Sequence, residues 1–138
     1  MSKIYIQGTF GAYSHLAALE IEPTAEVIPC KTFDECFLKA SSESGSQMLI
    51  PESNRITGNI GIEYLIFKYR LNIYAEHFLK IEHNLLGQSS ASLKDIKDVF
   101  SHSQGLSQCS NFIKKNDLVE HIRADTAGSA EAISKKKN

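Results

Sequence analysis

The sequence lacks the features that mark several classes of protein. No uninterrupted apolar run approaches the roughly 20 residues that a membrane-spanning helix needs, so we predict no membrane segment. The 15 basic and 16 acidic residues nearly balance and give a net charge of −1, which argues against a nucleic-acid partner. A strand-like pattern begins at Lys3 and leaves no room for a signal peptide, so we expect a cytoplasmic protein.

Patterns typical of metal sites are also absent from the sequence. The cysteines are Cys30, Cys36 and Cys109, and no two of them have the paired spacing of a zinc site. The five histidines form neither an H-x-x-x-H nor an H-E-x-x-H pattern. We therefore predict reduced cysteines and no metal ion.

What is present is an alternation of strand-like and helix-like segments, with enough apolar residues (42%) to form a core. The 138 residues suit one domain or two small lobes. The alternation predicts an α/β fold of mostly parallel sheets with helices on both faces. The predicted strands are 3–7, 25–30, 47–50, 97–102 and 118–123, and the predicted helices are 12–22, 59–69, 104–115 and 126–136. A further helix should begin after Thr32, with Phe33, Cys36, Phe37 and Ala40 on one face, and a short one at the capping-box-like stretch 92–95.

Four segments carry more specific expectations. Thr32 and Glu35 fit a capping box, in which each side chain satisfies a free backbone donor. The predicted helix 59–69 is apolar nearly all round, which indicates deep burial. Residues 71–86 are predicted to form one long extended segment, or two strands end to end, that crosses between two lobes. In the predicted helix 104–115, the inward face should carry Leu106, Cys109, Phe112 and Ile113.

Polar residues gather where strands end. "QGTFGAYS", "SHSQGLSQC" and "ADTAGSAEA" each stand where a strand is about to become a helix, and "PESNRITGNI" follows another strand. Ligands of open parallel sheets bind beyond the carboxyl ends of the strands. Free N–H groups at helix N-termini there favour carboxylates or phosphates. The four clusters therefore predict a site for an anionic small molecule.

Each cluster also has a structural interpretation. Gly8, Gly11 and Ser14 could only shape and cap a helix, and His102, a candidate general base beside Ser101, could be structural. Gln108 could be solvated on its helix. Asp125 and Thr126 are good helix caps. Arg55 suits a turn as well as a carboxylate. No catalytic triad or carboxylate pair can be assembled from the spacing alone.

Taken in order, the clusters resemble prephenate dehydratase, an enzyme family of phenylalanine biosynthesis. "IQGTFGAYSHLAA" resembles the family's opening G-x-x-G-[ST]-[YF]-[ST]-x-x-A-A. "IPCKTFDECFLKA" and "AEHFLKIEHNLLG" resemble its second strand-helix unit and its crossover segment. "VFSHSQGLSQCSNFI" resembles its S-H-x-Q-x-x-x-Q-C helix, and "ADTAGSAEAI" its D-T-A-x-[SA]-A element. The resemblance runs through nearly the whole chain.

The resemblance implies a two-lobed fold similar to type II periplasmic binding proteins, with the substrate between the lobes. We place the first lobe at 1–76 and an incomplete second lobe at 77–138, with no ACT regulatory domain. The implied reaction converts prephenate to phenylpyruvate, carbon dioxide and water without a metal or organic cofactor. The implied protein is a homodimer that binds neither nucleic acid nor membrane.

Carried over by position, the resemblance implies a set of substrate-binding residues. Ser101 and Gln108 match polar residues that line the family's cleft, and Asp125 matches an acidic position beside it. The set is completed by Thr126, Ala127, Asn54, Ser53, Gly8 and Thr9.

The sequence also departs from the family pattern. The family's P-I-E-N-S turn reads Pro51-Glu52-Ser53-Asn54-Arg55 here, so the roles of Glu52, Ser53 and Arg55 are open. The family's T-R-F motif, whose threonine the resemblance implies as the proton donor, is not among the 138 residues. We expect it beyond Asn138, and we expect this chain to bind prephenate weakly and to turn it over slowly or not at all. The alternatives are a small-carboxylate-binding module of the same two-lobed fold and, less favoured, a flavodoxin-like nucleotide-binding domain.

Overall fold

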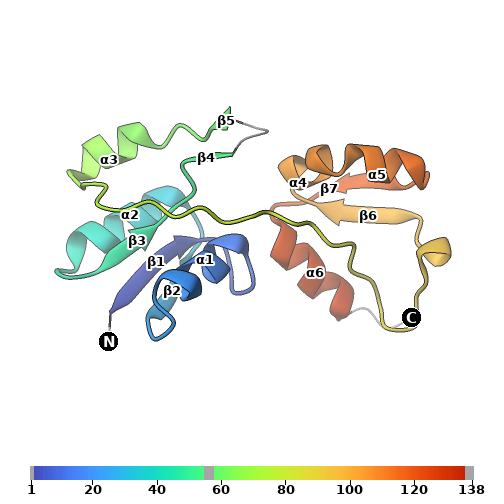
Figure 1. Ribbon diagram of the computed structural model, residues 1–138, viewed down its shortest axis with the longest axis horizontal. Coiled ribbons are helices and arrows are strands. Elements are labelled where there is room, and N and C mark those ends of the chain that lie inside the picture. The colour runs from blue at the N-terminus through green and yellow to red at the C-terminus, as the bar shows by residue number, and fades with distance from the viewer. Residues whose placement is uncertain (1, 55–57, 136–138) are drawn as a thin grey trace. The chain divides into compact units, whose positions relative to one another are not determined.

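The computed structural model describes residues 2–54 and 58–135. The chain divides into two compact units, 1–81 and 82–138, each of which is described by itself. Figure 1 shows the strands and helices of each unit. No helix within the described ranges combines the length and apolar character that crossing a membrane requires.

Unit 1 is a parallel three-stranded sheet between helices, as the alternation predicts. Strands β1 (Lys3–Gln7), β2 (Glu26–Cys30) and β3 (Gln47–Leu49) lie in the order β2-β1-β3. Helix α1 (Tyr13–Ile21) packs on β1 and β2. Helix α2 (Phe33–Ser42) packs on all three strands, and α3 (Glu63–Tyr69) packs on α2.

Strand β1 supplies the core on both faces of this sheet because successive side chains of a strand point to opposite sides. Ile4 and Ile6 pack with Ala18 of α1. Tyr5 lies on the other face, among Cys30, Cys36 and Ala40. Because α1 and α2 each cover one of these faces, the side chains of Ile4, Tyr5 and Ile6 at the centre of the sheet are buried.

The capping box of α2 forms in a shifted version. The Thr32 hydroxyl accepts a hydrogen bond from the Glu35 N–H at 3.1 Å, as predicted. The Glu35 carboxylate, however, accepts from the Lys31 N–H at 2.8 Å, one residue before the cap. Lys39 also pairs with Glu35 at 2.8 Å, and both contacts lower the pKa of the Glu35 carboxyl.

Glu43 joins the end of α2 to β1. Its carboxylate accepts hydrogen bonds from the Lys3 ammonium and from the Tyr5 hydroxyl. The Lys3 contact is the larger cause, and the Tyr5 contact the next, of a Glu43 pKa below its ordinary value of 4.5.

This contact predicts an acid-dependent loss of stability. Because the folded pKa of Glu43 is lowered, its stabilising contribution is present above about pH 4.5 and disappears as the pH falls through the folded value. The free energy of unfolding of Glu43→Gln should therefore lie below that of the unchanged chain at pH 7, with a difference that shrinks towards pH 3. Urea titrations at both pH values measure it, and a pH-independent difference would contradict the assignment.

Three predictions in unit 1 are corrected by the structure. The polar turn after β3 contains an antiparallel pair, β4 (Ser53–Asn54) and β5 (Gly58–Asn59). The predicted helix 59–69 begins only at Glu63, because the Asn59 side chain accepts from the Gly61 N–H and donates to the Glu63 carboxylate. The predicted deep burial of that helix is wrong: Ile62 and Leu65 are buried, but Phe67 is 88% exposed.

For the long segment after α3, the predicted extended alternative is confirmed and the predicted pair of strands is not (Figure 1). Residues 71–86 are extended, and none of the described strands forms a hydrogen-bonded ladder with them. Local side-chain contacts hold it instead: the Tyr74 hydroxyl donates to Gln47, and His77 contacts Glu20 at 2.9 Å. The boundary between the two units falls at 81/82, inside this segment.

Unit 2 repeats the strand-helix pattern on a smaller scale. Strands β6 (Asp98–Ser101) and β7 (Val119–Ile122) are parallel. Figure 1 shows α4 (Ser103–Gln108) and α5 (Ser110–Lys115) on one side of them and α6 (Thr126–Ser134) on the other. A short 3-10 turn, η1 (Leu93–Asp95), begins at a capping box formed by Ser92 and Asp95, as predicted.

Unit 2 differs from the prediction in two respects, the division of a helix and the exposure of Phe112. Leu106 and Ile113 are buried with Leu118, and Cys109 packs against them, as the helical spacing predicts. The predicted helix 104–115 is divided at Cys109, whose ψ of 7° departs from helical values. Phe112 is 44% exposed rather than inward, because neighbouring helical residues point about 100° apart and Ile113 takes the inward direction.

Candidate functional site

The carboxyl ends of β6 and β7 bring together several predicted site residues. Ser101 ends β6 and is only 9% exposed. Its hydroxyl lies 3.0 Å from that of Thr126, the first residue of α6. Ser101 is buried whereas Thr126 is exposed, so this hydroxyl pair at the end of two parallel strands is open on one side and can donate a hydrogen bond to an anion bound at that edge.

Gly105 allows this hydroxyl pair to form. It lies in α4, and a Cβ atom built on it would stand 2.9 Å from the Ser101 hydroxyl oxygen and 3.5 Å from that of Thr126. The first distance is too short for a real contact, so any larger residue would displace Ser101. Although sequence reasoning did not select Gly105, a lone glycine inside a helical pattern is the signal that could have found it.

Asp125 and His102 occupy capping positions. The Asp125 carboxylate accepts the Gly128 N–H at the start of α6, and its backbone carbonyl accepts the Ser129 hydroxyl at 2.7 Å. The His102 Nδ1 atom accepts the Gln104 N–H at 3.3 Å at the start of α4. The capping interpretation is therefore confirmed for Asp125 and describes His102 as well. Ala127 follows within the first turn of α6.

The Gln108 side chain is hydrogen-bonded to another side chain and is not simply solvated. It is the last residue of α4, and its carboxamide oxygen is hydrogen-bonded to the Nε2 atom of His83, which sequence reasoning did not single out. Gln108 lies three residues after Gly105, so both share one side of α4. The neighbouring Cys109 is no activated nucleophile, since burial raises the pKa of its thiol.

Unit 1 carries a second group of predicted residues, after β1. The Gly8 N–H donates to the Cys30 carbonyl at 3.0 Å, and the Thr9 carbonyl accepts from the Ala12 N–H at 3.1 Å. Gly8 has φ = +121°, a conformation that favours glycine. Ser14 is not the predicted cap: it lies inside α1, whose N-cap is Ala12, and no side chain in the described ranges caps that helix.

The third predicted group follows β3. Ser53 and Asn54 form β4, where they pair with Asn59 and Gly58. The Glu52 carboxylate lies 3.4 Å from the Asn59 amide nitrogen. Arg55 lies outside the described residues.

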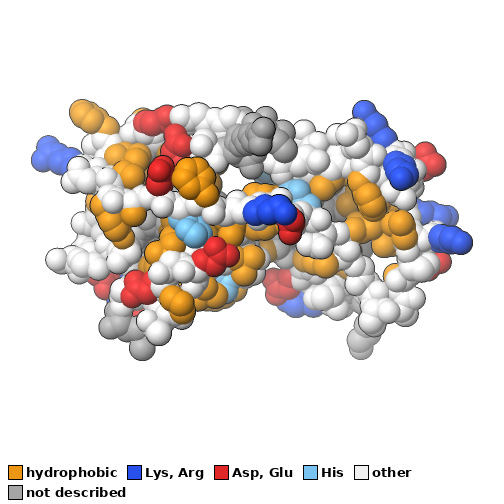
Figure 2. Space-filling model, viewed as in Figure 1, with side chains coloured by type: hydrophobic (Ala, Val, Ile, Leu, Met, Phe, Trp, Pro, Cys, Tyr) orange, Lys and Arg blue, Asp and Glu red, His pale blue; other side chains and the backbone are white. Residues whose placement is uncertain are grey.

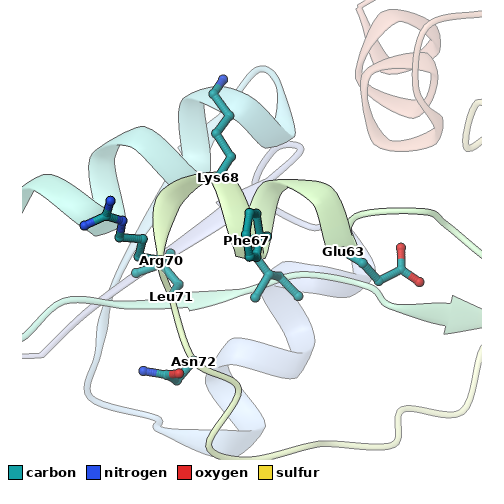
Figure 3. A pocket seen from close by; sticks show the side chains of 7 residues that line it. Glu63, Phe67, Lys68, Arg70, Leu71 and Asn72 are labelled. Carbon is teal, nitrogen blue, oxygen red and sulfur yellow. The ribbon is translucent and has the colours of Figure 1, made fainter.

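A surface hollow lies elsewhere in unit 1. It has a volume of about 750 Å³ and lies along α3 and the start of the extended segment. Figure 3 shows Glu63 at the beginning of α3 and Arg70 and Asn72 at its end. None of the predicted site residues lines this hollow.

The charge distribution agrees with a small-molecule site. On the face shown in Figure 2, Lys and Arg side chains are dispersed rather than gathered, and hydrophobic side chains lie exposed over both units.

Among residues 2–54 and 58–135, no three His, Cys, Asp or Glu side chains are grouped so that they could hold a metal ion.

Parallel strands covered by helices, with polar turns at the carboxyl ends, define an α/β protein of the periplasmic-binding-protein-like type. Two solved structures share the fold. One, "GqqA- a novel type of quorum quenching acylases", superposes with a TM-score of 0.83 at 30% identity, over 95% of this chain and 48% of that one. A prephenate dehydratase from Staphylococcus aureus gives 0.75 at 25% identity, over 96% of this chain and 51% of that one.

The sequence comparisons then give the family. The family model described as "Prephenate dehydratase" matches residues 4–138, and the chain belongs to this family. Arogenate dehydratase 2 of Petunia hybrida is 37% identical over 96% of this chain and 34% of its own length. The chain thus spans about a third of the length of that relative and about half of the two solved chains.

Proposed function

We propose that this chain provides substrate-binding residues of a dehydratase that converts prephenate to phenylpyruvate in phenylalanine biosynthesis. The observation that carries the proposal is the hydroxyl pair of Ser101 and Thr126, together with the hydrogen-bonded amide of Gln108 in the same unit, in a chain of this family. Within unit 1, we also propose Gly8, Thr9, Ser53 and Asn54 as ligand-binding residues.

The conversion of prephenate requires hydrogen-bond donors of this kind. Prephenate has two carboxylates and a hydroxyl on a ring that is not aromatic. Protonation lets the hydroxyl leave as water, the bond to the ring carboxylate breaks to release carbon dioxide, and that electron pair completes the aromatic ring. The protein must hold both carboxylates, exclude water and place one proton donor. Hydroxyl, amide and backbone N–H donors can hold the carboxylates.

The proton donor is a separate question. The resemblance assigns it to the threonine of a T-R-F motif, which the 138 residues do not contain. We therefore expect residues 1–138 to bind prephenate weakly and to form phenylpyruvate slowly or not at all. Phenylpyruvate production at the rate of a complete dehydratase would contradict this expectation.

Arogenate is a second candidate substrate because a 37% identical relative is named for it. It has an amino group where prephenate has a side-chain ketone, so the two share a ring and both carboxylates. A carboxylate-binding module without chemistry is the remaining alternative. That module would bind a plain dicarboxylate as well as it binds either ring compound.

Calorimetric titration of the chain with prephenate, arogenate and fumarate tests these proposals. We expect prephenate to bind more tightly than fumarate, and Ser101→Ala to weaken prephenate binding about tenfold through loss of a hydrogen bond to a charged group. Ser107→Ala, an exposed position on the same helix, is the matched control and should leave the affinity unchanged. Equal affinity for fumarate would favour the binding module, and no response to Ser101→Ala would remove the proposed site.

We also propose that the protein is a cytoplasmic homodimer that needs no cofactor. The free thiols of Cys30 and Cys36, buried side by side in the core cluster of unit 1, support a reducing compartment. Sedimentation equilibrium would test the dimer, since a monomeric mass at micromolar concentration would contradict it.

A further inference from the structure

A contact in unit 2 gives a role to a residue outside the predicted site. The Nε2 atom of His83 is in hydrogen-bond contact with the carboxamide oxygen of Gln108, 25 residues later in the chain. Both side chains are half-buried. His83 comes from the extended segment and Gln108 from the end of α4, so the contact joins two elements of this unit.

The atoms in contact decide which way the amide faces. A carboxamide oxygen only accepts hydrogen bonds, so the Nε2 atom of His83 must carry a proton. Both the neutral Nε2–H form and the imidazolium meet this condition. The amide nitrogen of Gln108 therefore faces away from His83, and it has no hydrogen-bond partner within the described part of the chain.

This orientation matters for an anionic ligand. An unrestrained glutamine can present either its oxygen or its nitrogen, and the oxygen would repel a carboxylate. Gln108 shares one side of α4 with Gly105, which lies against the hydroxyls of Ser101 and Thr126. A fixed Gln108 nitrogen adds a donor to the side of α4 on which Gly105 faces the hydroxyls of β6 and α6.

We propose that His83 is a positioning residue that holds the Gln108 carboxamide with its nitrogen turned towards the substrate carboxylate. The inference rests on the proposed function for its ligand, but the contact itself can be tested without one. His83 would act before binding, by removing the amide orientation that repels an anion, and would not touch the substrate.

The first test is the protonation of the imidazole, read from the nitrogen chemical shifts of His83 in the ligand-free chain. We expect a protonated Nε2 atom, with a shift that changes in Gln108→Leu. An unprotonated Nε2 atom would reverse the amide and overturn the inference, whether or not prephenate binds. Failure of the chain to bind prephenate would instead count against the proposed function.

The second test is a set of affinities for prephenate. His83→Leu removes the donor and should weaken binding about tenfold, whereas His83→Gln, whose amide nitrogen can replace Nε2, should stay within about threefold of the unchanged chain. In a Gln108→Leu background, His83→Leu should add less than about twofold, because the pair acts as one unit.

The matched control is His77→Leu, on the same extended segment but in contact with Glu20. It should leave the prephenate affinity unchanged. Equal losses in His83→Leu and His83→Gln, or an undiminished effect of His83→Leu beside Gln108→Leu, would indicate a structural role only. If His83→Leu does not fold, the His83→Gln variant and the nitrogen shifts still decide the matter.

Discussion

Gly105→Val is expected to destabilise unit 2 by about 1–3 kcal/mol and to weaken prephenate binding at least tenfold. Its Cβ atom would stand 2.9 Å from the Ser101 hydroxyl oxygen, and its two methyl groups would crowd the same space. Ser101 would have to turn away and give up its 3.0 Å contact with Thr126. Hydrogen exchange of the β6 and β7 amides measures the stability of this unit separately, and calorimetry measures the affinity.

Two further variants separate crowding from other effects of the substitution. Gly105→Ala should leave stability within about 1 kcal/mol, because the better helix propensity of alanine offsets the lost hydrogen bond. In a Ser101→Ala background the obstructing oxygen is gone, so Gly105→Ala should become stabilising by about 0.5–1 kcal/mol. If Gly105→Ala destabilised the chain equally in both backgrounds, the proposed contact with Ser101 would be wrong.

Phe37→Ala is expected to have the largest effect on stability, a loss of about 3–5 kcal/mol in the free energy of unfolding of unit 1. Phe37 is fully buried, and its ring lies 5.9 Å from that of Tyr69 in α3. Removing it leaves a cavity between α2 and its neighbours. Chemical denaturation, followed by the NMR signals of the β1 amides, would measure the loss in the free energy of unfolding.

Leu38→Ala is the matched control for this substitution. Leu38 is the next residue of α2 but is 53% exposed, so truncating it should cost less than about 1 kcal/mol. A loss at Phe37 no larger than the loss at Leu38 would show that the core of unit 1 has been placed wrongly.

The alternation of apolar and polar residues was enough to predict the elements of both cores. β1 spans Lys3–Gln7 as predicted, and Cys36, Phe37 and Ala40 are buried as the helical spacing of α2 requires. These residues face a sheet within their own unit, so local period and burial agree. The family resemblance added the fold type, which the periodicity alone does not specify.

The errors arise where tertiary contacts decide the outcome. The sequence shows that α3 is apolar on several sides, including Phe67, but not which side packs against α2. The contacts of Asp34 with Lys68 and Tyr69 help to fix that side. The start of α3 depends on the side-chain contacts of Asn59. Residues 71–86 have a strand-like composition, but a strand also requires a partner, which composition cannot supply.

Only part of the candidate site was predicted, because the rest of it depends on tertiary contacts. Strand ends located Ser101 and Asp125, because the position of a polar turn after a strand is a local property. The hydroxyl pair of Ser101 and Thr126 and the contact of His83 with Gln108 each join residues that are 25 positions apart in the sequence. No single-sequence pattern specifies these pairings.

Prephenate titration of the isotopically labelled chain, followed by backbone amide shifts, tests the central claim most directly. We predict that residues after β6 and β7 (101–108 and 125–128) shift together with one dissociation constant. Shifts confined to the hollow along α3, residues 63–72, would contradict a carboxylate site built from these strand ends.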